Sequence, residues 1–221
     1  MVDIFDEVDE DLRAERAQQL LKRYAGVIIA AALLVVGIAA GWQGWRWWQA
    51  RRDMQAAAAF ISATDTVRTV GPSADASSRQ AAIGAFARLA ASAPEGYRTL
   101  ARLREGALKA DAGDPAGAAA LYDQVAADTS ADKLLRDLAS LLWAQRQLDS
   151  GEPARLEARL KALAEPSNPW NALASEQLAL LDLRQGHTDA AKQTLRRLVA
   201  DPLLPQDLRA RTSGLLNRLG G

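Results

Sequence analysis

Apolar residues follow two different patterns along the chain. Residues 24–45 form a run without a charged residue, preceded by Lys22 and Arg23 and followed by Arg46. Beyond this run, apolar residues recur every three to four positions in segments that are separated by turns containing Gly or Pro, which is the pattern of amphipathic helices. We therefore expect an all-α protein in which one continuously apolar helix precedes a series of amphipathic ones.

The apolar run is long enough to cross a membrane. A helix rises about 1.5 Å per residue, and about 20 residues match a hydrocarbon core roughly 30 Å thick. A signal peptide or a buried core helix has the same hydropathy. However, the preceding segment is long and acidic for a signal peptide, and residues 41–44 lack a small-residue cleavage pattern. We interpret residues 24–45 as a permanent transmembrane helix.

Tryptophans and an arginine mark the end of the run. Tryptophan rings carry a polar edge and settle at the level of the lipid headgroups. Rings beside arginines also suit stacking on single-stranded nucleic acid, but next to a membrane span an interfacial belt is favoured. The predicted membrane-interface residues are Trp42, Trp45, Arg46, Trp47 and Trp48.

The orientation of the span does not follow from charge, because Lys and Arg are about equally frequent on its two sides. Long domains are translocated largely regardless of their charge. We therefore expect residues 1–23 to stay in the cytoplasm and the domain formed by residues 46–221 to be exported.

Three turn signals at similar spacing predict an internal repeat. Gly113, Gly151 and Gly186 lie 38 and 35 residues apart, and Pro115 and Pro153 suit the first turn of the helix that follows. The positions 5, 9 and 12 residues after each glycine are all apolar, and the position seven before it is Gly or Ala. The apolar positions are Ala118, Tyr122, Val125, Leu156, Leu160, Leu163, Ala191, Leu195 and Leu198.

This spacing resembles the tetratricopeptide repeat, a helix–turn–helix unit of about 34 residues. In that unit a small residue on the first helix faces a small and an aromatic residue on the second, which Gly106, Ala118 and Tyr122 match. Glu105 and Lys109 stand where the repeat usually buries apolar groups, and a plain helical bundle would reproduce part of the spacing. The predicted repeat-packing residues are Gly106, Ala118, Tyr122, Ala144, Leu156, Leu160, Ala179, Ala191 and Leu195.

The predicted fold is a right-handed α-solenoid of about four degenerate tetratricopeptide-like hairpins. The first hairpin would consist of a helix from Arg46 to Val70 that continues the span, a polar loop over residues 71–78, and a second helix that ends at Pro94. A last helix over residues 206–219 would cap the stack, because the final hairpin otherwise exposes an apolar face.

The first helices of such a stack form a long surface that suits an extended or helical polypeptide. The same apolar residues would fit equally well into the core between the hairpins. The candidate partner groove consists of Leu100, Leu103, Ala107, Leu138, Leu141, Leu173 and Leu180.

Charge and composition argue against several other classes of function. The 27 basic residues balance the 27 acidic ones, so we expect no nucleic-acid partner. Without Cys there are no thiolate metal sites or thiol nucleophiles, and His187 lies in a predicted turn. Mixed-charge runs such as residues 102–105 have the pattern of solvated helix faces. Because no nucleotide-binding or hydrolase motif is present, we expect no enzyme, no cofactor and no metal.

Two segments carry a more specific resemblance. Residues 3–13, which read DIFDEVDEDLR and lead to Leu21-Lys22-Arg23-Tyr24, and residues 41–49, which read GWQGWRWWQ, resemble the ancillary SecYEG translocon subunit family, also called YfgM-like proteins. This resemblance implies an inner-membrane protein with a cytoplasmic N-terminus, whose periplasmic domain assists secreted proteins. The implied partners are Sec translocon subunits, periplasmic chaperones and client polypeptides.

The leading hypothesis is therefore a non-enzymatic, membrane-tethered interaction scaffold at the Sec translocon that assists the periplasmic handling of secreted proteins. An alternative is an envelope scaffold that organises partners in cell division or outer-membrane biogenesis. An enzyme is the third class, and a bound metal or cofactor in the purified protein would indicate it.

Overall fold

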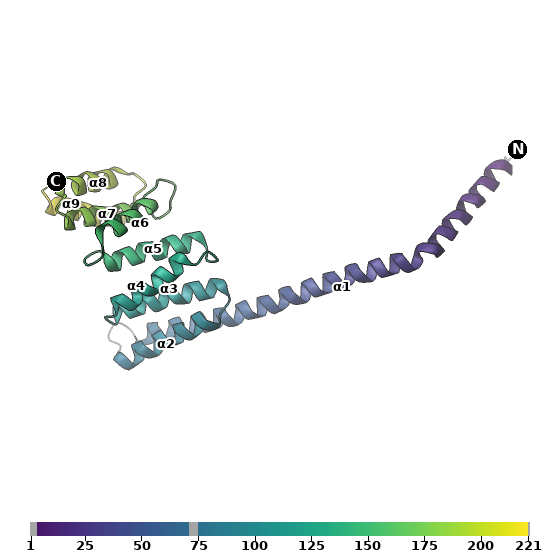
Figure 1. The fold of residues 1–221 in the computed structure, drawn as a ribbon, viewed down its shortest axis with the longest axis horizontal. Coiled ribbons are helices and arrows are strands. Elements are labelled where there is room, and N and C mark those ends of the chain that lie inside the picture. Colours follow the sequence, from purple (N-terminus) through teal and green to yellow (C-terminus); the bar gives the residue numbers. More distant parts are fainter. Residues whose placement is uncertain (1–3, 71–74, 221) are drawn as a thin grey trace. The chain divides into compact units, whose positions relative to one another are not determined.

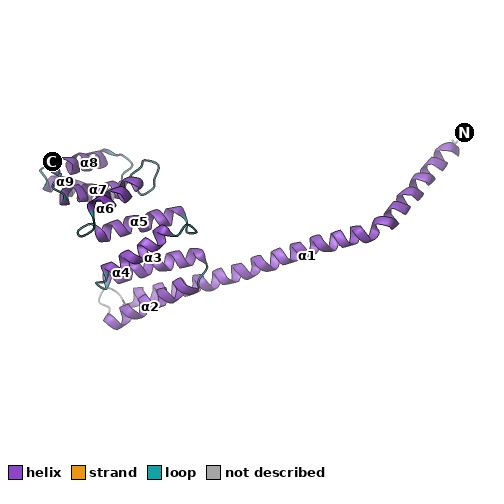
Figure 2. Cartoon of the chain, in the orientation of Figure 1, coloured by secondary structure: helices purple, strands orange, loops and turns teal. Residues whose placement is uncertain are grey.

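The computed structural model describes residues 4–70 and 75–220, and the side chains from residue 24 onward except those of residues 28, 69 and 70. The predicted loop at residues 71–74 and the acidic N-terminal side chains that carry part of the family resemblance lie outside this description. All elements within it are helices (Figure 2). The chain divides into two compact units, Met1–Arg52 and Asp53–Gly221.

The first helix, α1, is continuous from Ile4 to Val70. It contains the apolar run, and the expected continuation of that helix to Val70 is confirmed. From Asp53 onward α1 belongs to the second unit, where Ala56 and Ala63 are buried. The Phe60 ring packs edge-on against Phe86, with 5.5 Å between the ring centroids.

Eight further helices follow within the described residues of the second unit, which we call the repeat domain (Figure 1). Each of them packs against the next one along the chain. Four hairpins result, formed by the end of α1 with α2, by α3 with α4, by α5 with α6, and by α7 with α8. The last helix, α9, covers the fourth hairpin. The predicted solenoid of helical hairpins is confirmed. The helices are α2 (Ala76–Ser92), α3 (Glu95–Asp111), α4 (Pro115–Ala127), α5 (Lys133–Gln147), α6 (Pro153–Leu163), α7 (Asn171–Arg184), α8 (Thr188–Ala200) and α9 (Gln206–Arg218).

Two of the three predicted glycine turns have the left-handed backbone that glycine adopts without steric cost. Gly113 has φ of 85° and Gly186 has φ of 81°, and each follows the end of a first helix. Gly151 does not have a positive φ. A Cβ atom at Gly151 would lie 2.7 Å from the carbonyl oxygen of Gln147, so this turn requires glycine because the backbone passes close to itself.

The polar loop before α2 is shorter than predicted. The Asp75 carboxylate accepts a hydrogen bond of 2.8 Å from the backbone N–H of Ser78, which caps the N-terminus of the helix. Ala76, Ser77 and Ser78 therefore form the first turn of α2 and do not belong to the loop.

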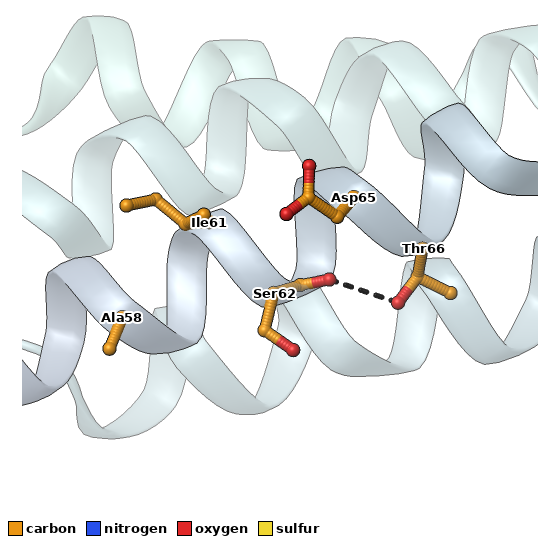
Figure 3. Close-up of a pocket in the computed structure, with 5 residues that line it drawn as sticks. All are labelled: Ala58, Ile61, Ser62, Asp65 and Thr66. Carbon is orange, nitrogen blue, oxygen red and sulfur yellow. Dashed lines mark hydrogen bonds between the residues drawn. The ribbon is translucent and has the colours of Figure 1, made fainter.

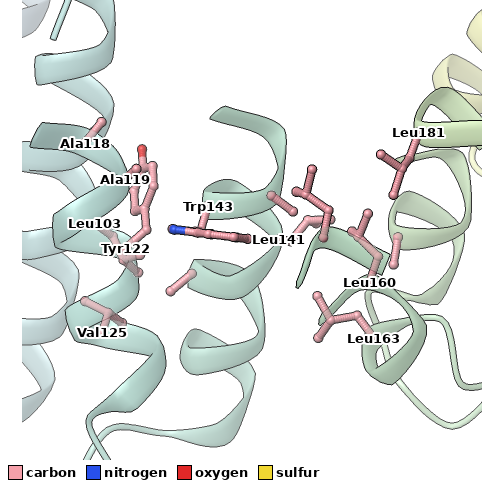
Figure 4. Packing of buried hydrophobic residues seen from close by; sticks show 14 residues of the cluster. Leu103, Ala118, Ala119, Tyr122, Val125, Leu141, Trp143, Leu160, Leu163 and Leu181 are labelled. Atoms are coloured by element: carbon pink, nitrogen blue, oxygen red, sulfur yellow. The ribbon is translucent and has the colours of Figure 1, made fainter. Parts of the chain in front are cut away.

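The core of the repeat domain consists of separate clusters. The largest runs from α3 to α7 and contains Tyr122, Leu141 and Trp143 (Figure 4). A second cluster joins the end of α1 with α2 and α3. A small third cluster is formed by Ala179, Ala191 and Leu195, beneath leucines of α9. Most contacts between helices nevertheless join helices that follow one another in the chain, as is typical of repeat stacks.

Gly106 and Tyr122 face each other inside the second hairpin. A Cβ atom at Gly106 would lie 2.7 Å from Cε1 and 3.0 Å from Cζ of the Tyr122 ring, which is fully buried. Burial also raises the pKa of the Tyr122 phenol. The Tyr122 ring therefore occupies the space that a side chain at residue 106 would fill.

We predict that Gly106→Leu destabilises the repeat domain by about 1–3 kcal/mol through overpacking. The sequence alone suggested that Gly106→Ala would be neutral or slightly stabilising. The 2.7 Å approach changes this expectation, because the Tyr122 ring must move even for one methyl group, which offsets a helix-propensity gain of about 1 kcal/mol. Urea denaturation of the protein measures both variants, and Gly96→Ala, at an open position on α3, is the matched control. A raised midpoint for Gly106→Leu would contradict this packing.

Candidate functional site

The end of the apolar run presents the predicted belt residues along α1. The stretch Tyr24–Arg68 contains a window with a mean hydropathy of 2.4 and no buried side chains, so it is long and apolar enough to span a membrane. Between half and two-thirds of the surface of each belt tryptophan is exposed. The Trp42 and Trp45 rings contact each other, with 5.7 Å between their centroids. Arg46 is also exposed.

The leucines of the candidate groove separate into two groups. Leu103 and Leu141 are buried in the largest cluster, so these two residues form core and are not accessible to a partner. Leu100 is 37% exposed, and Ala107, Leu138, Leu173 and Leu180 are half-buried. Leu138 and Leu173 pack against the edge of the core with part of their surface outside it. The accessible apolar surface of α3, α5 and α7 is therefore smaller than the predicted groove.

The structure places all predicted repeat-packing residues inside the repeat domain. Gly106 is buried beside Tyr122, and each of the others is fully buried. Leu156 and Leu160 belong to the largest cluster together with Ala118, Tyr122 and Ala144. Ala179, Ala191 and Leu195 form the third cluster with one another.

Glu105 is buried, although its sequence neighbourhood has the pattern of a solvated face. Only 8% of its surface is exposed, because α3 turns this position toward the interior. Its nearest cationic group is Lys109, with 3.9 Å between Nζ and Oε1, and Lys109 also lies 3.8 Å from the Asp114 carboxylate. Burial raises the pKa of the Glu105 carboxyl, and the positive charges of Lys109 and Arg102 offset only part of this effect.

We predict that Glu105→Gln stabilises the repeat domain near neutral pH. The folded state holds the Glu105 proton more tightly than the unfolded state does. The free energy of unfolding therefore falls as the pH rises above the ordinary pKa of a glutamate side chain. Glutamine removes this loss, and its advantage should vanish at about pH 3, where the carboxyl is protonated in both states. Urea unfolding at the two pH values measures the difference, with the exposed Glu165→Gln as control. A lower stability of Glu105→Gln at neutral pH would mean that the contact with Lys109 outweighs burial.

A cluster of charged and aromatic side chains that the sequence pattern did not predict joins the second and third hairpins. Trp143 of α5 is 6% exposed, and the guanidinium carbons of Arg155 and Arg159 lie 4.8 Å and 4.1 Å from the centre of its ring. Both arginines pair with the Asp123 carboxylate of α4. Beside them lies an open depression of about 310 Å³ that is lined in part by Ala119, Trp143 and Arg155. The sequence provides no clear indication of this cluster, because its residues lie on three different helices.

An ion pair that the sequence pattern did not predict joins the last helix, α9, to the fourth hairpin. Glu176 of α7 is 1% exposed and accepts two hydrogen bonds from Arg211 of α9, one of them 2.6 Å long from Nε to Oε1. These bonds to Glu176 raise the pKa of Arg211 further. The pair thus contributes to the docking of the capping helix and is not free to react with a substrate.

Two further depressions in the described residues are also open to solvent. One is lined by residues of α1 alone, with Ile61 60% exposed and the Thr66 hydroxyl donating a hydrogen bond of 2.9 Å to the Ser62 carbonyl oxygen (Figure 3). Another lies beside Asn168 and Leu134, where α5 begins. Such shallow surfaces are typical of sites for other proteins, whereas small ligands bind in enclosed pockets.

The described residues contain no cluster of His, Asp and Glu side chains that would hold a metal ion. His187 is exposed in the turn before α8, and its Nδ1 lies 3.8 Å from the Asp182 carboxylate. The features that remain for function are the apolar helix with its belt and the exposed faces of the repeat domain.

A family model described as a tetratricopeptide repeat-like domain matches residues 18–138, which is more than half of the chain. The matched segment begins ahead of the apolar run and ends within α5. No curated protein and no solved structure matches the chain.

Proposed function

Because the chain belongs to the tetratricopeptide repeat-like domain family, whose members are typically protein-interaction modules and not enzymes, we propose that it is a membrane-tethered scaffold at the Sec translocon. In this role it assists the periplasmic handling of secreted proteins. The observation that carries the proposal is that α1 provides both the apolar segment and the first helix of the repeat domain. A scaffold built in this way is tethered to the membrane through the same helix that begins its repeat domain.

The proposed client surface consists of the accessible apolar positions on the first helices of the hairpins. Leu100 of α3 and Leu180 of α7 are its two ends, and Leu138 and Leu173 lie between them in the sequence. Short apolar contacts spaced along a repeat stack suit an unfolded segment, which presents apolar side chains at intervals. The modest apolar area favours weak, reversible binding, as handling of a secreted chain requires.

In the proposed topology, residues 1–23 lie in the cytoplasm, residues 24–45 span the inner membrane, and the domain from residue 46 onward lies in the periplasm. Protease added to spheroplasts should degrade the repeat domain and spare a tag at the N-terminus. The opposite pattern would contradict any contact with secreted proteins on the periplasmic side.

Site-specific crosslinking in native membranes tests the partners. A photo-crosslinking residue at Leu100 or Leu180 should recover translocon subunits and secreted chains, whereas the exposed positions Gln124 and Gln193 on second helices serve as controls. Recovery of cell-division or outer-membrane assembly proteins without translocon subunits would replace the proposal with an envelope scaffold.

A further inference from the structure

The end of the apolar segment of α1 carries three arginines whose charges are not compensated. No acidic residue occurs between residues 24 and 52, and Asp53, which follows directly, forms no ion pair with these arginines among the residues that the structure describes. In the described part of the chain, none of Arg46, Arg51 and Arg52 forms an ion pair, whereas most arginines of the repeat domain do so or bind carbonyl groups. Positive charge therefore accumulates here without an internal partner.

Two of these arginines are held by tryptophans one helical turn before them. The Arg51 guanidinium lies 5.3 Å from the centre of the Trp47 ring, and that of Arg52 lies 4.8 Å from the centre of the Trp48 ring. The pairs are spaced i and i+4, so all four side chains share one side of α1. A guanidinium that lies over a ring keeps its N–H groups free along its edge, and these groups match two oxygens of a phosphate.

The position along the helix fits the headgroup layer. The uncharged run ends at Trp45, and the rings that hold the two guanidinium groups belong to Trp47 and Trp48, about 3–5 Å further along the axis at about 1.5 Å per residue. The headgroup layer of one leaflet is about 5–8 Å thick, as given by the difference between the whole bilayer and its hydrocarbon core. Tryptophan rings settle at this level. The guanidinium groups that lie over these rings would therefore be at the level of the lipid phosphates if residues 24–45 span the membrane.

We propose that Trp47, Trp48, Arg51 and Arg52 form a binding site for the headgroups of anionic phospholipids in the leaflet next to the repeat domain. This inference rests on the membrane span of the proposed function and not on its partners. A zwitterionic headgroup offers the same phosphate, but its ammonium group is repelled by the arginines. Each arginine near an anionic membrane surface should enrich anionic lipid around the site about fivefold.

Quenching of tryptophan fluorescence by brominated lipids tests the proposal with the full chain in vesicles. One set of vesicles contains brominated phosphatidylglycerol diluted in phosphatidylcholine, and the other contains brominated phosphatidylcholine diluted in phosphatidylglycerol. Four of the six tryptophans lie in the belt, so quenching reports the lipids that surround it. The wild-type protein should be quenched more strongly by the brominated phosphatidylglycerol, and the difference should shrink in high salt.

The variant Arg51→Gln/Arg52→Gln should lose most of this preference while both lipids still quench. Arg51→Lys/Arg52→Lys retains the charges and the membrane anchor but not the planar fork, and it should keep only part of the preference. Arg196→Gln/Arg197→Gln removes two adjacent exposed charges of α8 and should behave like the wild type.

Equal quenching of the wild type by the two lipids, or an unchanged preference in Arg51→Gln/Arg52→Gln, would overturn the lipid site. If neither lipid quenched the wild-type protein, the chain would not be inserted, and the membrane tether of the proposed function would fail together with this site. Crosslinking to partners other than the translocon would leave the lipid site untouched.

Discussion

Replacing Trp143 with alanine should lower the free energy of unfolding of the repeat domain by about 3–5 kcal/mol, as is usual for a buried tryptophan. The side chain is 6% exposed and belongs to the cluster that extends from α3 to α7 (Figure 4). Its removal leaves a cavity and also exposes the two arginines that lie over its ring. Urea denaturation followed by circular dichroism measures the loss.

The variants Trp143→Phe and Arg155→Gln separate packing from the cation–ring contact. Phenylalanine retains most of the buried aromatic body and should cost less than alanine. Arg155 is half exposed, so its contact with the ring and with Asp123 should contribute about 1 kcal/mol or less. A loss below about 1 kcal/mol for Trp143→Ala would mean that the second and third hairpins do not depend on this ring.

Replacing Arg211 with leucine should cost roughly 3 kcal/mol, because it leaves the Glu176 carboxylate buried without its partner. Removing one member of a buried pair typically costs about 3–5 kcal/mol. We expect the lower part of this range, because the Arg211 side chain is 56% exposed while that of Glu176 is 2% exposed. The same urea experiment measures the effect.

A double replacement distinguishes the buried charge from the geometry of α9. In Glu176→Leu/Arg211→Leu no charge is left in the interior, so most of the stability should return. Arg218→Leu, on the exposed side of the same helix, should change the stability by no more than about 0.5 kcal/mol. A cost of Arg211→Leu equal to that of Arg218→Leu would contradict a role of the pair in docking the cap.

The sequence predicted those parts of the fold that depend on local chemistry. Gly113 and Gly186 end helices through their backbone freedom, and Pro115 and Pro153 begin α4 and α6 as predicted. Such signals are independent of the rest of the chain. Periodicity also predicted which face of each second helix is buried, because nine positions at fixed distances from the glycines are apolar, and all nine are buried.

Periodicity did not predict which neighbour an apolar position meets. Leu100 and Leu103 on α3, like Leu138 and Leu141 on α5, fit the same helical periodicity of apolar residues. Leu103 and Leu141 nevertheless belong to the core, whereas Leu100 and Leu138 retain accessible surface. Within each pair the two leucines are three residues apart on one helix, about 60° around its axis, so one lies in the core and the other at its edge. Contacts between distant residues were not predictable for a related reason: Glu176 and Arg211 are 35 residues apart, and each alone has the pattern of a surface charge.

The division of the core into clusters has a consequence for how the repeat domain opens. An end unit of a stack is held by one interface, whereas a central unit is held by two. The two clusters that hold α8 and α9, one around Leu195 and one around Leu208, are each smaller than the cluster of α3–α7, so α8 and α9 should exchange their amide hydrogens through a local opening that leaves α3–α7 closed. A protein bound to the central helices would then remain in place while the far end of the stack opens and closes.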